Sequence, residues 1–269
     1  MTAVQKKRPA QRSGGGLWSA VKWTIAIGAA GALSGVFLLI FVFAYIYQQL
    51  PSIDVLTDYR PKVPLRVWSA EGRLIGEFGE ERRDFVRIAD VPKHVKDAIL
   101  CAEDDGFYEH HGIEVMARAA IINVLTGRRG QGGSTITMQV ARNFFLTTER
   151  TYTRKLYEIA MSFKIENELT KDQILEIYMN QIYLGQRAYG FEAAAKTYFG
   201  RPLAEISVGE AATIAGLPVA PSAYNPIVNP TRATMRRNYV LRRMYDLGRI
   251  DELTYQTEKS LPMEVRRAV

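Results

Sequence analysis

The chain has 269 residues, of which 47% are hydrophobic and 23% are charged, and it carries a formal net charge of +7. This composition is typical of a folded protein of one or two domains and excludes a low-complexity or disordered chain. The one cysteine, Cys101, excludes an intrachain disulfide, and its apolar neighbours favour a small core residue.

The positive charge is concentrated at the N-terminus. Five basic residues precede Trp23 with no acidic residue among them, so the remaining chain is close to neutral. A nucleic-acid-binding protein instead carries its basic residues as a patch on the folded domain. The charge distribution therefore predicts no nucleic-acid partner.

An uncharged and mostly apolar stretch runs from Trp23 to Tyr47. About 20 apolar residues cross the hydrocarbon core of a bilayer, whereas the apolar core of a secretory signal is shorter. The sequence predicts one transmembrane helix over residues 23–47, so the bilayer is an expected partner. The basic residues place residues 1–22 in the cytoplasm as a short tail and the bulk of the chain across the membrane.

A linker and a hairpin are predicted after the span. Residues 48–64 are expected to be a linker that is extended from Pro51 to Pro64, and residues 65–269 the exported domain. The first segment of this domain, Leu65–Phe78, alternates around Glu71-Gly72, which is typical of a β-hairpin.

Beyond the hairpin the apolar residues recur with the period of a helix, which predicts a mainly α domain. The pattern is clear in HVKDAILCAED, in RKLYEIAMSFKIENEL and in the basic segment from Thr231 onward. Two more helices begin at capping boxes, Thr170 with Gln173 and Ser207 with Glu210. The residues expected to share apolar faces in the first two segments are Val95, Ala98, Ile99 and Ala102, and Leu156, Ile159, Ala160 and Phe163.

The stretch CAEDDGFYEHHGIE admits three interpretations: a metal site, a catalytic carboxylate or a solvated acidic loop. Two histidines that bind one metal from a helix lie about four residues apart, whereas His110 and His111 are adjacent. Glu103 ends an apolar-faced helix beside Asp104 and Asp105, and both partial burial and like charges raise a carboxyl pKa toward the range of a general base. The residues favour a carboxylate over a metal and leave an acidic helix end as the alternative.

A glycine-rich segment, GRRGQGGSTITMQVARNFF, follows. Gly130, Gly132 and Gly133 permit unusual backbone angles, and Ser134 is expected to cap the next helix. Free N–H groups at a helix start, with Arg142 nearby, suit a phosphate, although a capped surface helix fits the same residues.

In RKLYE, Arg154 and Glu158 lie four residues apart on a predicted helix. One interpretation is an exposed ion pair, which contributes only a few tenths of a kcal/mol. The other is a second catalytic-site carboxylate with its cationic partners.

Five motifs occur in a fixed order after the predicted span: EDDGFYEHHG, GGSTITMQVARN, RKLYE, KDQILEIYMN and YLGQRAYGFEAAAKTYFG. Together they resemble the peptidoglycan glycosyltransferases, which form the polymerase domain of class A penicillin-binding proteins and of monofunctional transglycosylases. The resemblance runs from about Trp68 to Lys259. It implies a mainly α, lysozyme-like glycosyltransferase fold with a smaller membrane-proximal lobe.

The resemblance also implies a reaction and its partners. The growing glycan on undecaprenyl pyrophosphate is the donor, the 4-hydroxyl of lipid II is the acceptor, and a β-1,4 bond forms with inversion. Lipid II, the nascent glycan strand and other cell-wall synthesis proteins are the implied partners, at the bacterial cytoplasmic membrane with the catalytic domain on its periplasmic side. A divalent cation such as Mg²⁺ acts in the family, although the motifs do not require one, and no organic cofactor is implied.

By match to the motifs, Glu103 is the general base, and Glu158 is the second glutamate, which orients substrate or holds a cation. The residues matched to substrate binding are Asp104, His110, Ser134, Thr135, Gln139, Arg142, Asn143, Arg154, Lys155, Arg187 and Gly190. Among them Arg142, Arg154 and Lys155 provide positive charge for the leaving pyrophosphate. No residue is matched to a metal.

The sequence departs from the family at two points. Met138 stands where the family often has glutamine, so this position is expected not to be essential. The chain ends at Val269 without transpeptidase motifs, and its S-x-x-K at Ser19–Lys22 lies at the membrane edge. The expectation is a chain without a transpeptidase domain, either a fragment of a bifunctional enzyme or a complete protein.

Two other functions compete with polymerisation. A lysozyme-type hydrolase needs a protonated carboxyl for the leaving sugar oxygen and has no use for cations at a pyrophosphate. A non-catalytic membrane scaffold has no need of the combined set Glu103, Arg154, Lys155 and Glu158. The residues favour the polymerase over both.

Overall fold

The structure is a computed structural model that describes residues 15–57, 65–72, 74–78, 81–109, 134–145 and 152–265. The chain divides into two compact units, Met1–Gln49 and Leu50–Val269, each of which is described here by itself. The predictions for His110, His111 and the three glycines Gly130, Gly132 and Gly133 lie outside the described residues.

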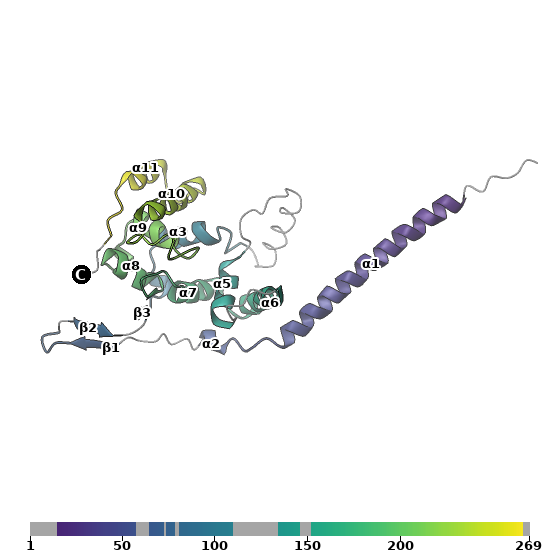
Figure 1. Cartoon of the computed structure of the whole chain (residues 1–269), viewed down its shortest axis with the longest axis horizontal. Helices are drawn as coiled ribbons and strands as arrows, with labels where there is room; N and C mark the ends of the chain where they lie inside the picture. Colours follow the sequence, from purple (N-terminus) through teal and green to yellow (C-terminus); the bar gives the residue numbers. More distant parts are fainter. Residues whose placement is uncertain are drawn as a thin grey trace, which may run out of the picture. The chain divides into compact units, whose positions relative to one another are not determined.

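The described part of the first unit is one long helix, α1 (Gly15–Gln48), drawn in purple in Figure 1. Its segment Trp18–Gln48 has 31 residues and is long and apolar enough to cross a membrane. At about 1.5 Å per residue such a helix exceeds the ~30 Å hydrocarbon core of a bilayer. Large apolar side chains such as Phe37 and Leu39 are exposed along it. The helix predicted over 23–47 is confirmed, and its orientation across a membrane stays a prediction.

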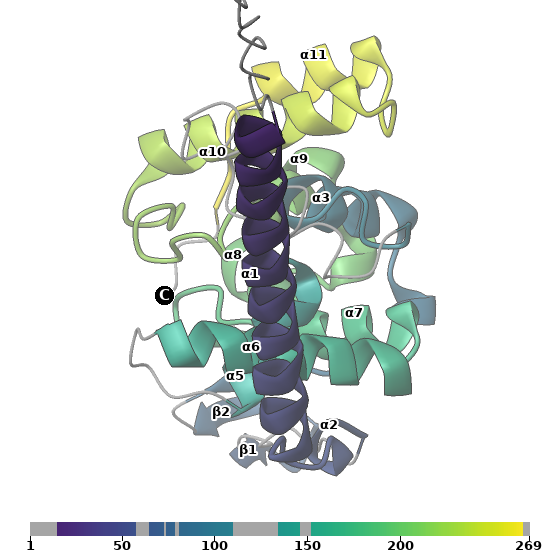
Figure 2. The same ribbon diagram turned by 90° about the vertical axis from the view of Figure 1, so that its right-hand side faces the viewer.

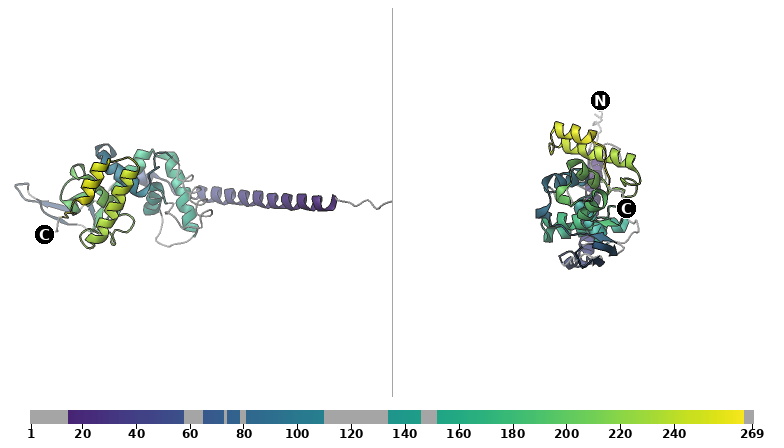
Figure 3. Two further views of the ribbon diagram at one scale, coloured as in Figure 1. Left: turned by 90° about the horizontal axis from the view of Figure 1, so that it is seen from above. Right: turned by 90° about the vertical axis from the view of Figure 1, so that its left-hand side faces the viewer.

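Two groups of helices build the second unit. The first contains α3 (Lys93–Glu103), α9 (Val208–Ala215), α10 (Pro230–Asp246) and α11 (Glu252–Ser260). The second contains α5 (Ile136–Phe145), α6 (Tyr152–Glu168) and α7 (Lys171–Gln181). α8 (Phe191–Phe199) contacts α7 and α9 and so joins the groups. In Figure 2 α10 and α11 lie at one end of this unit and α5 and α6 toward the other, and Figure 3 shows the same order from two further sides.

The described strands are short. β1 (Leu65–Trp68) and β2 (Leu74–Phe78) pair antiparallel, which confirms the predicted hairpin. Gly72 adopts a φ of 76° in its turn, a value that glycine reaches without strain. β3 (Arg82–Arg83) pairs in parallel with β4 (Ala188–Tyr189), and two short 3₁₀ helices, η1 (Ile88–Asp90) and η2 (Leu203–Glu205), complete the connections.

The extended conformation predicted from Pro51 to Pro64 is wrong in its described part. A one-turn helix, α2 (Asp54–Thr57), interrupts it, and the side chains of Ile53 and Leu56 are buried. Lys164 on α6 donates a 3.0 Å hydrogen bond from Nζ to the carbonyl oxygen of Pro51. This segment packs within the second unit because removing two large apolar side chains from water is favourable.

The predicted helix in HVKDAILCAED is α3, and its apolar face is confirmed because Val95, Ala98 and Ile99 are fully buried. On α6 the predicted face is rotated. Leu156 is 43% exposed, whereas Glu158 is 1% exposed. α6 packs against α5 with a face that includes this carboxylate, so apolar periodicity alone did not locate the buried side.

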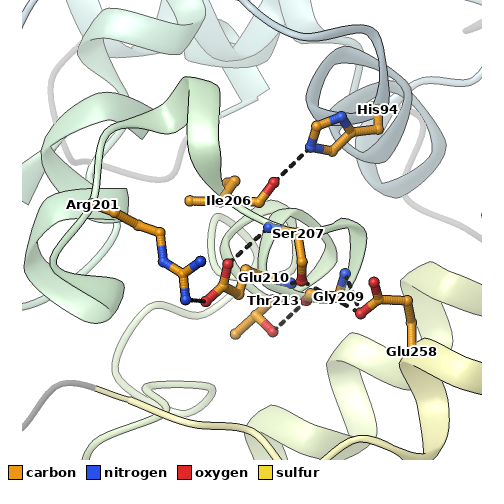
Figure 4. A network of polar contacts seen from close by, with 8 residues as sticks. All are labelled: His94, Arg201, Ile206, Ser207, Gly209, Glu210, Thr213 and Glu258. Atoms are coloured by element: carbon orange, nitrogen blue, oxygen red, sulfur yellow. Dashed lines mark hydrogen bonds and ion pairs between the residues drawn. The ribbon is translucent and has the colours of Figure 1, made fainter.

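Both predicted capping boxes are confirmed, and the one at Ser207 anchors α9 to its neighbours (Figure 4). Ser207 accepts from the backbone N–H of Glu210, whose carboxylate accepts in return from that of Ser207 at 2.8 Å. Glu258 of α11 accepts from the N–H of Gly209 at 3.0 Å, and His94 of α3 contacts a carbonyl oxygen just before the helix at 2.9 Å. Three helices are therefore joined at one helix start.

Asn180→Ala is expected to lower the free energy of unfolding by about 2–3 kcal/mol, because three buried hydrogen bonds are lost. The side-chain oxygen of Asn180 accepts from Val86 N at 2.9 Å, and its amide nitrogen donates to the carbonyl oxygens of Val86 and Glu176 at 2.9 and 2.8 Å. Urea denaturation of the full chain in detergent measures the loss. The control is Asn229→Ala, which removes one exposed hydrogen bond; equal losses in both variants would contradict the prediction.

Candidate active site

A cavity of about 450 Å³ is lined by residues from both groups of helices. Six residues matched by the sequence motifs line it: Glu103, Asp104, Ser134, Thr135, Gln139 and Arg142. α3 supplies the first, and α5 with the two residues before it supplies the last four. The fold thus brings together two motifs that lie about 30 residues apart.

Glu103 is the last residue of α3 and lies partly buried in the cavity wall. Its Oε2 accepts a 2.7 Å hydrogen bond from the side-chain amide of Gln139. Burial raises the pKa of the Glu103 carboxyl above its ordinary value, while the Gln139 hydrogen bond and the positive charges of Arg236 and Arg142 lower it. Burial thus favours the neutral carboxyl, whereas the hydrogen bond and the two arginines favour the carboxylate.

Like charge contributes less to this pKa than the sequence suggested. The charge of Asp104 raises the pKa of Glu103, but it ranks below burial, the Gln139 hydrogen bond and the two arginines. Asp105 forms an ion pair with Arg243 of α10, with 3.0 Å between Oδ2 and Nη2. Burial rather than the acidic run is thus the main reason for the raised pKa.

Asp104 connects the two halves of the site. It is the C-cap of α3 and is only 8% exposed, and its Oδ2 accepts from the backbone N–H of Ile136 at 3.3 Å. The prediction that Ser134 caps the following helix is wrong, because α5 begins at Ile136 and Thr135 Oγ1 accepts from Met138 N at 3.2 Å. Thr135 therefore caps α5, because its hydroxyl accepts from the third N–H of the helix.

A second charged pair lies beside α5. Lys155 Nζ is 2.9 Å from Glu158 Oε1, and the same nitrogen is 3.9 Å from the sulfur of Met138. Glu158 is 1% exposed and the Lys155 side chain 44% exposed, so this is no surface ion pair of the kind that RKLYE also allowed. Met138, expected to be unessential, is fully buried in this contact.

The remaining predicted residues lie outside the cavity lining. Arg154 is half-buried on α6, and Asn143 is exposed on α5. Arg187 is exposed in a turn where its φ is 63°, and its carbonyl oxygen accepts from Arg82 N at 2.8 Å. Gly190 has a φ of 88°, and an added Cβ would lie 3.0 Å from two carbonyl oxygens of α7, so the backbone itself requires glycine there.

Comparison with known proteins assigns the chain to a family. A family model described as transglycosylase matches residues 71–245, which include Glu103, the cavity and the Lys155–Glu158 pair. The chain belongs to the transglycosylase family.

Relatives of this transglycosylase carry the name penicillin-binding protein 1A. The chain is 53% identical over 221 residues to the protein of Neisseria flavescens, an alignment that covers 81% of this chain and 28% of the relative. It is 49% identical over 248 residues to that of Pseudomonas aeruginosa, covering 91% and 29%. A crystal structure of the Haemophilus influenzae protein matches with a TM-score of 0.47 and 31% identity, over 78% of this chain and 22% of that one. The chain spans less than a third of the length of these relatives.

The transglycosylase cavity also contains residues that sequence reasoning did not assign to it. Pro218 and Val219 come from the proline-rich loop, and Tyr239 and Arg243 from α10. Arg236, also on α10, acts on the pKa of Glu103, and its guanidinium lies 4.7 Å from the centre of the Tyr239 ring. The basic character of this helix was visible in the sequence, but which of its arginines face the site depends on tertiary packing.

Glu103→Gln is expected to make the transglycosylase more stable than the wild type at pH 8 and equally stable at pH 4. Because the pKa of Glu103 is raised in the folded state, its stabilising contribution is full below the unfolded-state pKa and is lost as pH rises through the folded-state pKa. The glutamine variant has no such loss. Urea denaturation of the full chain in detergent at both pH values measures the difference.

The control for this prediction is Asp105→Asn, which removes an exposed carboxylate that is paired with Arg243. It is expected to lower stability at pH 8 by at most about 1 kcal/mol, the opposite direction. A Glu103→Gln variant that is less stable than the wild type at pH 8 would contradict the expectation.

Proposed function

We propose that the chain polymerises the glycan strands of peptidoglycan from lipid II, with Glu103 as the general base. The observation that supports this most is the state of the Glu103 carboxylate. Gln139 orients Oε2, while Oε1 is buried and has no hydrogen-bond partner among the residues that the structure describes. Glu103 lines a cavity with cations at its edge, and Oε2 keeps a lone pair beside its hydrogen bond from Gln139, so this carboxylate is suited to accept the proton of a substrate hydroxyl.

In the proposed step, the 4-hydroxyl oxygen of lipid II attacks C1 of the sugar that links the growing glycan to its pyrophosphate. The bond from C1 to the pyrophosphate oxygen breaks, and its electron pair leaves with the pyrophosphate. The hydroxyl proton passes to Glu103. Attack from the face opposite the leaving group inverts C1 and gives a β-1,4 bond.

The leaving pyrophosphate is a stable anion, so it requires positive charge rather than a proton. Arg142 lines the cavity, and Lys155 reaches α5 at Met138. We assign these two cations, together with Arg154, to the pyrophosphate. Ser134 also supports a polar ligand, because its buried hydroxyl oxygen has no hydrogen-bond partner within the described segments.

A divalent cation stays a prediction of the resemblance. Within the described residues no group of three or more His, Cys, Asp and Glu side chains could hold one, and Glu158 is already paired with Lys155. These residues do not by themselves fit a metal site, so no step above is assigned to Mg²⁺.

We further propose that α1 anchors the enzyme in the cytoplasmic membrane, with residues 1–22 in the cytoplasm, a span over 23–47 and the glycosyltransferase domain, residues 65–269, on the outer side. The length and apolar composition of α1 support the anchor, and the basic tail supports the orientation. Lipid-linked substrates lie in the same bilayer, so anchoring raises their effective concentration. Other cell-wall synthesis proteins are proposed partners on the basis of the family alone.

Glu103→Gln is expected to lower polymerisation about 10²–10⁴-fold while the protein stays folded, because the neutral amide cannot take the hydroxyl proton. Lengthening of glycan chains from labelled lipid II measures the rate, with and without a chelator. Turnover within a few-fold of the wild type would remove Glu103 as the base. Shortening of preformed glycan, without lengthening, would support a hydrolase instead.

Arg154→Ala is expected to reduce the polymerisation rate by about 10²-fold, as for the loss of one electrostatic group at a developing charge. The matched control is Arg242→Ala, which breaks an exposed i,i+4 ion pair with Asp246 on α10. The control is expected to stay at the wild-type rate. If both variants polymerise equally well, Arg154 has no role at the pyrophosphate.

A further inference from the structure

Tyr178 carries a buried hydroxyl that the proposed mechanism does not use. It lies on α7, its side chain is 1% exposed, and its hydroxyl oxygen has no hydrogen-bond partner among the described residues. A buried tyrosine hydroxyl normally finds a partner, because leaving it unpaired is unfavourable. Tyr198 shows the usual arrangement: it is equally buried, and its hydroxyl donates to the carbonyl oxygen of Leu184 at 2.7 Å.

The unpaired oxygen of Glu103 is the complementary group. α7 packs against α5, the helix whose Gln139 holds the other oxygen of this carboxylate. After burial, the two influences on the pKa of Tyr178 are the negative charge of Glu103, which raises it, and the positive charge of Arg142, which lowers it. The hydroxyl therefore lies within electrostatic reach of the carboxylate.

We propose that the Tyr178 hydroxyl donates a hydrogen bond to one enclosed water molecule, which donates in turn to Oε1 of Glu103 and so positions the catalytic base. The two side chains are not hydrogen-bonded to each other directly. The inference rests on the proposed function of Glu103. Toward an ionised carboxylate the phenol can only donate, because the carboxylate has no proton to give. Oε1 is buried, so the acceptor hydroxyl of the substrate is assigned to the second lone pair of Oε2, beside the Gln139 hydrogen bond.

The other groups around Glu103 are accounted for. Gln139 of α5 donates to Oε2, Arg142 of α5 and Arg236 of α10 add positive charge, and Asp104 adds negative charge. Tyr178 would be the donor that comes from α7. Its hydrogen bond stabilises the charged form of the base and so counteracts the effect of burial.

The test is the pH dependence of kcat/KM for Tyr178→Phe, measured with the full chain in detergent and labelled lipid II. Loss of the donor is expected to move the acidic limb of the kcat/KM profile to higher pH by about one unit. On that limb kcat/KM falls ~10-fold, and at the alkaline plateau it stays near the wild-type value. KM for lipid II is expected to stay unchanged. Incorporation of 3-fluorotyrosine at position 178 makes the phenol a stronger donor and is expected to move the limb to lower pH.

Tyr198→Phe is the matched control, since it removes an equally buried hydroxyl that is bonded elsewhere. It is expected to leave the limb in place, even if it lowers the overall rate. An unmoved limb in both variants at position 178, or an equal shift in Tyr198→Phe, would overturn the proposal. Should Tyr178→Phe fail to fold, the fluorotyrosine shift decides alone.

Failure of this inference is distinguishable from failure of the proposed function. An active Glu103→Gln variant overturns the role of Glu103 and with it this inference. An inactive Glu103→Gln variant with an unmoved limb after the changes at position 178 overturns the role of Tyr178 alone.

Discussion

The partly buried carboxylate of Glu103 constrains the structure around it. A carboxylate removed from water is unfavourable unless hydrogen bonds and positive charge replace its hydration. Here Gln139 supplies the hydrogen bond, and Arg236 and Arg142 supply the charge. These side chains come from α5 and α10, which belong to different groups of helices, so the site exists only when the two groups are assembled.

Besides α8, a polar contact close to the site joins the two groups. Asp104 follows Glu103 directly and accepts from the N–H of Ile136, which fixes the end of α3 against the start of α5. Lys155 and Glu158 of α6 form a charged pair beside this region, and Lys155 contacts Met138 of α5. Neighbouring residues therefore determine both the catalytic geometry and the packing of the helices. A substitution at one of them is expected to affect both stability and activity.

Features of the chain that depend on local interactions were predictable. The long apolar helix, the hairpin, α3 and both capping boxes were predicted from composition, alternation and spacing, and each is confirmed. Two of the three errors occurred where tertiary contacts outweigh local preference, and the third, the cap of α5, was a choice between two adjacent residues. The cap of α5 is Thr135 instead of Ser134, the buried face of α6 includes Glu158, and two apolar side chains fold part of the expected linker into α2.

The sequence by itself determined the membrane-length helix, the helical character of the domain and, through five ordered motifs, the transglycosylase family, because these depend on residue type and on spacing along the chain. Only the tertiary structure decided which charges surround Glu103. Arg236, Arg243 and Tyr239 lie more than 130 residues from it in the sequence, and no spacing rule connects them. A pKa depends on burial and on distances through space, and both are properties of the packed chain.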